Sequence, residues 1–329
     1  MSARDLAPIM SVEATVLPPR TVAARTVKGK RPNAGRRLAL DTVMRYVVGV
    51  LAWSAPFLLV AIAAGLAIKS APVLAQVPLL DLLTSSEWKP MKGSFGFLPF
   101  IIGTVEVTLI AIIVAIPFGV LTGVYLAEYA GKGVQRFAAP VLDILGGIPS
   151  VIFGIWGVVL IVPFVRDTVA PWFNYSSTGY TVLSGGLVLS VMVFPLLTQV
   201  VYEVMRTVPS GLRDAGLALG ATRWETTRQV IVRKAMPGIW AACILGFSRA
   251  FGETIAVLMV VGNTVQIPAH PLEAGYPIPA LIANNYGEMM SIPMYDSALM
   301  FAALLLLVIV LGFNLYARRV LKRMELRSA

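Results

Sequence analysis

The sequence has very little of the side-chain chemistry that enzymes and metal proteins use. Its one cysteine, Cys243, lies in an apolar run, which excludes an internal disulfide and a multi-cysteine metal site. Its one histidine, His270, lies in a proline-rich stretch and is expected to be an ordinary loop residue. No nucleophile, general base or metal cluster can be recognised. The sequence therefore predicts no catalytic residues and no metal site.

Charged residues are also scarce, at 13% of 329 residues, whereas about 25% is usual in soluble domains. Hydrophobic residues make up 57% of the chain, and the mean hydropathy is +0.79. A soluble protein of this length could not bury so much apolar surface. The composition thus predicts an integral membrane protein surrounded by lipid bilayer.

Long apolar runs predict an all-α fold with six membrane-spanning helices, because about 20 apolar residues cross a bilayer. The expected spans are approximately 46–68, 99–127, 138–165, 181–202, 238–262 and 296–316. Gly119 and Gly123 in the second span predict close packing against another helix. Proline and glycine residues in the third span predict a kinked helix beside a polar path. Asp143 in that span is interpreted as an end cap or packing partner.

The net charge of +10 comes from Lys and Arg residues in alternating loops, which is the pattern that orients a protein in a membrane. No nucleic-acid partner is therefore expected. The 27 Lys and Arg residues lie in the segments predicted to be cytoplasmic, apart from Lys69, Lys89, Lys92, Arg166 and Arg249. Both termini are therefore placed on the cytoplasmic side of the plasma or inner membrane. Residues 1–43 are expected to be a disordered basic tail, and residues 44–329 the membrane domain.

The polar loop at 203–237 contains a short segment of small residues. Pro209 and Ser210 are typical of a helix start, and Gly220 is typical of a stop. Small side chains between them would let another protein approach closely. The loop therefore predicts a helical docking segment.

The fifth span contains two charged residues, Arg249 and Glu253. A spacing of four places them on one face of a continuous helix. Each charge costs about 2.5–3.5 kcal/mol at the bilayer centre, so a role is expected for both. One interpretation is a binding site on a path through the membrane, and the other is a structural ion pair.

The loop resembles the EAA motif of ABC-importer permeases, with Asp214, Ala215, Gly216 and Gly220 at the motif positions. Asp for Glu, Gly for Ala, and Arg233 where proline is usual are departures from that motif. The stretch from Arg249 to Glu253 and onward, Arg-Ala-Phe-Gly-Glu-Thr-Ile-Ala-Val, is similar to PstC-type permease subunits of phosphate-specific ABC importers. Residues 127–130, 142–150 and 281–288 are similar as well, and the resemblance covers roughly 45–318.

This resemblance implies import of inorganic phosphate by alternating access. It implies a heterodimer with a PstA-like permease subunit, two PstB-like ATPase subunits, and a PstS-like phosphate-binding protein on the outer side. Arg249 and Glu253 would line the substrate path, and Asp214, Ala215, Gly216 and Gly220 would couple to the ATPase. The chain has no Gly-x-x-x-x-Gly-Lys-Ser/Thr motif, so ATP would bind the partner ATPase and this chain would hold no cofactor.

Two alternatives remain open. The substrate could be another oxyanion, such as molybdate or phosphonate. The chain could instead be a membrane scaffold or phosphate-signalling subunit without transport activity.

Overall fold

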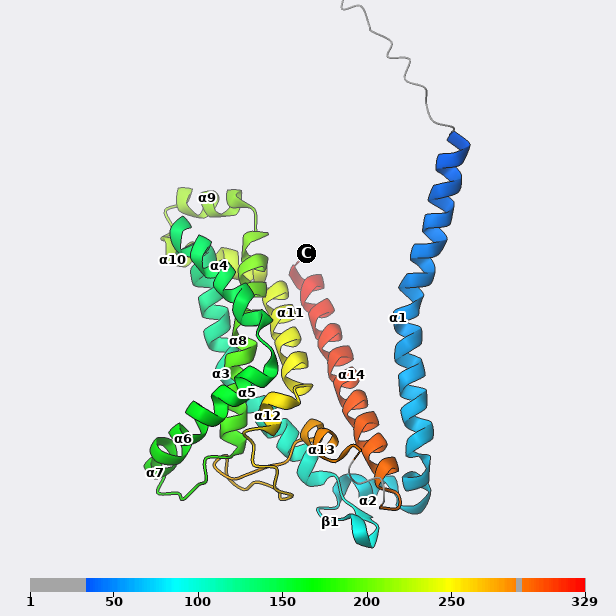
Figure 1. Cartoon of the computed structure of the whole chain (residues 1–329). Coiled ribbons are helices and arrows are strands. Elements are labelled where there is room, and N and C mark those ends of the chain that lie inside the picture. The colour runs from blue at the N-terminus through cyan, green and yellow to red at the C-terminus, as the bar shows by residue number, and fades with distance from the viewer. Residues whose placement is uncertain (1–33, 288–291, 329) are drawn as a thin grey trace, which may run out of the picture. The chain divides into compact units, whose positions relative to one another are not determined.

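A computed structural model describes residues 34–287 and 292–328, which are mostly helical (Figure 1). The chain divides into two compact units, residues 1–57 and 58–329. Helix α1 (Ala34–Gln76) begins in the first unit and ends in the second. Residues 34–43 belong to this helix, so the prediction of a disordered tail is wrong for them. The rest of the predicted tail, residues 1–33, lies outside the described residues.

After α1, the second unit begins with helix α2 (Leu79–Thr84) and a small antiparallel hairpin. The hairpin consists of β1 (Trp88–Lys89), the 3₁₀ turn η1 (Pro90–Lys92) and β2 (Ser94–Phe95). The long helices that follow are α3 (Leu98–Glu128), α4 (Lys132–Gly147), α8 (Val182–Arg206), α11 (Val232–Phe251) and α14 (Tyr295–Ser328).

Shorter elements connect these helices. Between α4 and α8, one helical stretch contains two π-helical segments: α5 (Ser150–Trp156), η2 (Gly157–Ile161), α6 (Val162–Phe164), η3 (Val165–Val169) and α7 (Ala170–Trp172). Between α8 and α11 lie α9 (Ser210–Ala218), α10 (Arg223–Glu225) and the π-helical segment η4 (Thr226–Ile231). Between α11 and α14 lie α12 (Ile255–Leu258) and α13 (Ile278–Asn285).

The described residues contain six helices that are long and apolar enough to cross a membrane. They run through Ala39–Gln76, Leu98–Glu128, Ser150–Trp172, Val182–Arg206, Arg223–Phe251 and Tyr295–Arg323. The predicted fold class, an all-α membrane protein with six spans, is therefore confirmed.

Two of the expected spans have the wrong boundaries, and both errors occur at helix breaks. The expected third span, 138–165, is divided after Gly147, because Ile148 precedes Pro149 and adopts an extended backbone (φ −65°, ψ 130°). The expected fifth span, 238–262, ends at Phe251, where Gly252 leaves the helix. That span instead begins at Arg223, inside the predicted loop.

Helices α3 and α8 form the centre of the larger hydrophobic core, and α11, α5 and α12 pack around them. Glycines bring α3 and α8 into close contact. A Cβ atom at Gly119 would lie 2.8 Å from the Leu197 Cβ, and one at Gly123 would lie 2.8 Å from the Val201 Cβ. The predicted close packing of this glycine pair is confirmed.

A second hydrophobic cluster lies at the hairpin and contains aromatic side chains. The Trp88 ring makes edge contacts with the rings of Phe95, Phe97, Phe100 and Tyr295. Two side-chain hydroxyls also bind backbone in this region: Thr104 Oγ1 accepts the N–H of Ile278, and Ser297 Oγ accepts that of Val73. The Thr104 contact joins α3 to α13, and the Ser297 contact joins α14 to the end of α1.

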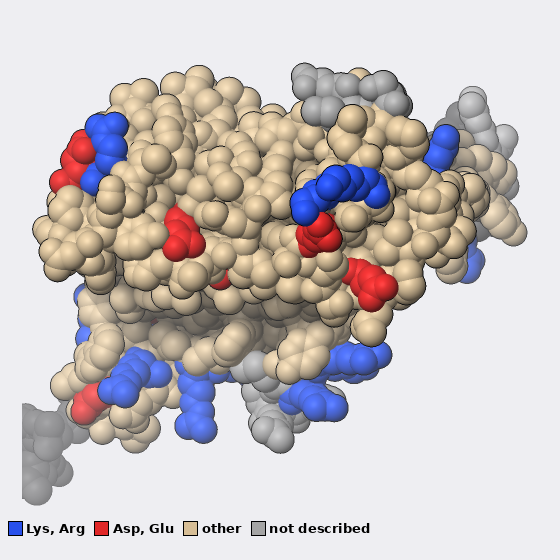
Figure 2. Space-filling view, turned by 90° about the horizontal axis from the view of Figure 1, so that it is seen from below, with Lys and Arg blue, Asp and Glu red and all other residues tan. Residues whose placement is uncertain are grey.

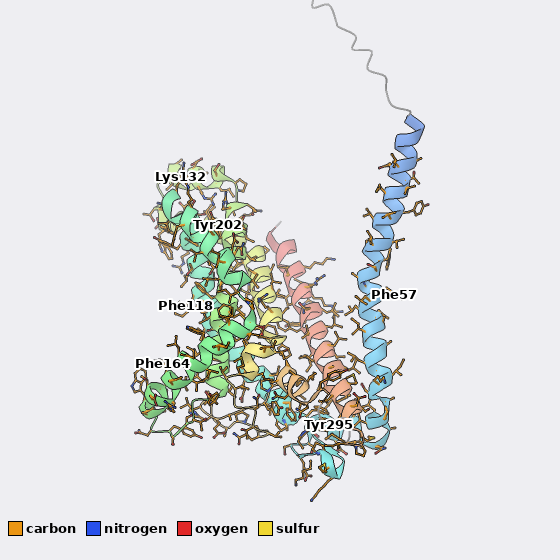
Figure 3. All side chains as sticks on the ribbon, in the orientation of Figure 1. Phe57, Phe118, Lys132, Phe164, Tyr202 and Tyr295 are labelled. Atoms are coloured by element: carbon orange, nitrogen blue, oxygen red, sulfur yellow. The ribbon has the colours of Figure 1, made fainter. Side chains whose placement is uncertain are left out.

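The larger unit has two chemically different ends. The end with the hairpin and α13 has a mostly uncharged face with separate charged spots (Figure 2). Tyr295 and Phe164 lie toward that end, whereas Lys132 and Tyr202 lie toward the end formed by α9 (Figure 3). The α9 end also includes Arg206, at the end of α8, and Arg213, in α9 itself. This charge difference agrees with a cytoplasmic position for α9.

Candidate functional site: a pocket with one arginine and a docking helix

A pocket of about 300 Å³ lies between α4, α8 and α11. Its lining consists of Asp143, Gly146 and Gly147 from α4, Met192, Leu196 and Gln199 from α8, and Arg249 from α11. Met192 is buried and belongs to the larger hydrophobic core, so this side of the pocket is apolar. The polar groups come from Asp143, Gln199 and Arg249.

Arg249 is the basic residue of this pocket and lies in the last turn of α11. A cation is favoured there because the carbonyl end of a helix has a partial negative charge. The side chain is exposed in this chain, and no described residue accepts a hydrogen bond from its guanidinium. A planar set of five N–H donors is therefore available to an oxyanion.

Asp143 and Gln199 form a hydrogen-bonded pair across the same pocket. Gln199 Nε2 donates to Asp143 Oδ1 at 2.8 Å. The expectation that Asp143 is a packing partner agrees with this contact between α4 and α8, and the residue also belongs to the pocket lining. The two residues are far apart in the chain, so spacing alone could not have paired them.

Glu253 does not share a helix face with Arg249, and the prediction of an i, i+4 pair is wrong. The helix ends at Phe251, and Glu253 lies in the break before α12. Its Oε1 accepts the N–H of Ala256 at 3.4 Å. Among the described residues, Glu253 makes no ion pair with Arg249, and it does not line the pocket.

The predicted docking segment forms a separate helix, α9, between Pro209 and Leu219. Gly220 ends it with φ +83°, a left-handed conformation that favours glycine. The N–H of Gly220 donates to the Leu217 carbonyl and that of Ala221 to the Gly216 carbonyl, which is the Schellman pattern. The predicted stop at Gly220 therefore agrees with the structure.

The small residues of α9 lie on two faces. Gly216 is buried, and a Cβ atom there would lie 2.7 Å from Thr226 Cγ2 in η4. Asp214 and Ala215 are exposed, and the following Leu219 is 89% exposed. The inner face of α9 thus fits against its own chain, and the outer face is free for another protein.

Arg213 anchors α9, a role that the sequence analysis missed. Its Nη2 donates to Glu128 Oε1 at 2.6 Å and to the Met205 carbonyl at 3.1 Å, and its Nη1 donates to the Val208 carbonyl at 2.8 Å. The Glu128 side chain is 6% exposed. The hydrogen bond to Glu128 raises the pKa of Arg213 above its ordinary value. The bridge joins the end of α3 to α9.

His270 lies in the loop between α12 and α13, as expected. Its ring stacks on Tyr175, with ring centres 5.3 Å apart, and its Nδ1 accepts the N–H of Leu272. In the described part of the chain, no three His, Cys, Asp or Glu residues gather in a way that could hold a metal ion.

Six helices that are long and apolar enough to cross a membrane, a pocket between α4 and two of these helices, and a helix exposed at one end are the features of a membrane-spanning transport component. Residues 115–326 match the family described as binding-protein-dependent transport system inner membrane component. The chain belongs to this family, and it is a multi-pass membrane permease subunit.

Proteins of similar sequence support the same family assignment. The chain is 37% identical to the probable ABC transporter permease protein YqgH of Bacillus subtilis, over 73% of this chain and 76% of that protein. It is 33% identical to the phosphate transport system permease protein PstC of Xylella fastidiosa, over 76% of this chain and 81% of that protein. The resemblance to PstC-type permeases, first drawn from short motifs, is thereby confirmed.

Solved structures with the same fold come from other transporters. A chain of the MetNI methionine ABC transporter, in an inward-facing conformation, superposes with a TM-score of 0.52 at 20% identity, covering 72% of this chain and 99% of that chain. A chain of a bacterial ABC transporter that imports the polysaccharide alginate superposes with a TM-score of 0.60 at 15% identity, covering 87% and 99%.

Proposed function

We propose that this permease subunit imports inorganic phosphate and that the pocket at Arg249 lies on the substrate path. The observation that carries the proposal is an arginine that has no acceptor among residues 34–287 and 292–328 and that lines a pocket of about 300 Å³. Arginine suits phosphate because its planar donors meet two oxygens at once. The PstC-type relatives, which are named for phosphate transport, support the choice of substrate.

The two alternatives have less support. A scaffold or signalling subunit without transport would not need an unpaired charge in a pocket between spans, since such a charge is costly. Molybdate or phosphonate would also bind an arginine, but the names of the relatives favour phosphate.

The proposed assembly follows the family. It contains a PstA-like permease subunit, two PstB-like ATPase subunits that bind ATP, and a PstS-like phosphate-binding protein on the outer side. Asp214, Ala215, Gly216 and Gly220 form the segment that couples to the ATPase. Movement of α9 would pass through Arg213 and Glu128 to α3, and directly along the chain to α8. The pocket would then open alternately to the two sides.

Glu253 is retained in this proposal as a second residue of the path. It is partly buried, and it lies at an interruption between α11 and α12. A carboxylate at membrane depth is costly enough that a functional role is the first hypothesis.

The test is uptake of radiolabelled phosphate into vesicles that contain this chain, its partner permease, the ATPase and the binding protein. We expect uptake to require ATP. Arg249→Ala is expected to lower uptake about 10- to 100-fold, which corresponds to the ~1.5–3 kcal/mol of a hydrogen bond to a charged group. Arg249→Lys keeps the charge but loses the planar fork, so it is expected to be impaired as well.

Arg319→Ala is the matched control, because Arg319 is an exposed arginine near the end of α14. Normal uptake by Arg249→Ala at a normal membrane level would contradict the pathway role. Uptake that does not depend on ATP would contradict the ABC mechanism. An active ATPase without phosphate uptake would direct the search to other oxyanions.

A further inference from the structure

We propose that Asp143 makes this pocket selective for oxyanions that carry a proton, so that phosphate is accepted and sulfate and molybdate are rejected. The inference rests on the proposed function, because it assumes that the pocket binds phosphate. It adds Asp143 of α4 as a residue that determines selectivity, and it requires that the substrate oxyanion carry a proton.

Asp143 is placed to act on a bound ion together with Arg249. Both residues line the same pocket of about 300 Å³. They make no ion pair in the described structure, so their opposite charges do not neutralise each other by contact. An ion bound by the Arg249 guanidinium would therefore have the Asp143 carboxylate in the same space.

The hydrogen bond from Gln199 fixes only one oxygen of this carboxylate. Oδ1 accepts from Gln199 Nε2 at 2.8 Å, and Oδ2 has no donor among the residues that the structure describes. The carboxylate is thereby oriented while keeping acceptor capacity. An ionised carboxylate can only accept hydrogen bonds, so a ligand at Oδ2 must supply a donor.

The end of α4 adds to this preference. Gly146 and Gly147 are the last residues of the helix and also line the pocket. The carbonyl end of a helix has a partial negative charge, which favours donors and cations and disfavours bare oxygens. The pocket thus pairs a cation on α11 with acceptors on α4.

Phosphate meets both requirements, because at neutral pH it keeps at least one P–O–H group beside its charged oxygens. The charged oxygens can accept from Arg249 while the hydroxyl donates to Asp143. Sulfate and molybdate are fully deprotonated at neutral pH, so their oxygens would face the carboxylate without a hydrogen between them. A bare anionic oxygen beside the carboxylate is repelled, and such a repulsive contact with the wrong ligand is one way in which a site gains specificity.

The experiment measures binding of radiolabelled inorganic phosphate to the purified complex of this chain, its partner permease and the ATPase, without the binding protein. Unlabelled phosphate, sulfate and molybdate are the competitors. For wild type, we expect about 100-fold more sulfate or molybdate than unlabelled phosphate to be needed to displace half of the labelled phosphate, because like charges side by side cost several kcal/mol. Asp143→Asn keeps an Oδ1 acceptor for Gln199 but removes the charge, so the ratio is expected to fall below about tenfold, a change of at least ~1.4 kcal/mol.

Asp81→Asn is the matched control, because Asp81 is an exposed carboxylate in α2 and does not line the pocket. It should keep the wild-type ratio. Asp143→Ser serves as a second variant if the asparagine variant does not assemble, and the same loss of selectivity is expected.

The two proposals fail in different ways. An assembled Asp143 variant could keep the wild-type ratio of competitor concentrations while Arg249→Ala loses phosphate binding. That result would overturn the role of Asp143 alone. Phosphate binding that is absent in wild type, or unchanged in Arg249→Ala, would overturn the pocket as the phosphate site and the selectivity proposal with it.

Discussion

At the scale of single residues, the function depends on which charged groups have partners. Arg249 has no described acceptor, whereas Arg213 donates to a carboxylate and two carbonyls. Both are arginines near helix ends, and their sequence neighbourhoods do not separate them. The difference in hydrogen bonding shows Arg213 as a structural residue, and it supports the proposal that Arg249 binds the ligand.

Glu273 in the loop between α12 and α13 provides a prediction about pH. Its Oε2 accepts the Ala269 N–H at 3.0 Å and its Oε1 accepts the Tyr175 hydroxyl at 2.9 Å. These hydrogen bonds lower the pKa of Glu273 below its ordinary value. Its contribution to stability is therefore present above the ordinary carboxyl pKa of about 4.3 and is lost as the pH falls through the lower folded value.

The measurement compares the Tm of wild type with that of Glu273→Gln. Wild type is expected to be more stable at about pH 6, and the difference is expected to shrink as the pH falls below the ordinary carboxyl pKa of about 4.3 and through the lower folded value. A difference in Tm that stayed constant over this range would show that the carboxylate charge does not matter.

At the scale of elements, helix interruptions place the candidate residues. The break after Gly147 puts the end of α4 at the pocket, and the break after Phe251 separates Glu253 from Arg249. A continuous fifth span would have joined the two charges as a neighbouring pair. The break after Phe251 instead leaves Arg249 available to a ligand and places Glu253 away from it.

Two substitutions at Glu253 separate its charge from its hydrogen bond to Ala256. Glu253→Gln keeps an oxygen acceptor for that N–H and removes the charge, whereas Glu253→Ala removes both. Because the proposed role depends on the charge, both variants are expected to lower phosphate uptake about tenfold, or ~1.4 kcal/mol. Normal uptake by Glu253→Gln together with a loss in Glu253→Ala would show that Glu253 only caps α12.

At the scale of the whole molecule, the proposed mechanism requires that movement of α9 reach the pocket along the length of the spans. α9 lies at one end of α8, whose inner residues line the pocket. The exposed face of α9 is the part that a partner ATPase could contact. Gly220 is a poor place to test this contact, because its φ of +83° would strain any side chain added there.

Ala215→Trp is a cleaner test, because Ala215 is exposed within α9. The chain is expected to reach the membrane at a normal level, while recovery of the ATPase with the purified permease falls about tenfold, since bulk in the centre of an interface is costly. Gly133→Trp is the control: Gly133 lies in α4 next to Lys132, near the same end, and a Cβ atom there meets open space. Full recovery of the ATPase with Ala215→Trp would contradict the coupling role of α9.

The sequence allowed the number of spans, the glycine contact of α3 with α8 and the ends of α9 to be predicted, because each depends on local composition or spacing. The Arg213–Glu128 and Gln199–Asp143 contacts join residues 85 and 56 positions apart, so no local pattern contains them. The pairing of Arg249 with Glu253 was wrong because helical spacing applies only within an unbroken helix. Gly252 was the available signal for that break.

The glycine contact between α3 and α8 has a mechanical consequence. Since even a methyl group at Gly119 or Gly123 lacks room, the two helices can neither slide nor roll against each other without separating. Helices α3 and α8 therefore form one rigid unit, and α8 provides one wall of the pocket. Helix α11 packs on α8 just as closely, since a Cβ atom at Gly246 would lie 2.8 Å from Leu197 Cδ2 and one at Gly238 would meet Val204. We therefore expect the volume of the pocket to change mainly through α4, whose Gly146 and Gly147 have open space around them.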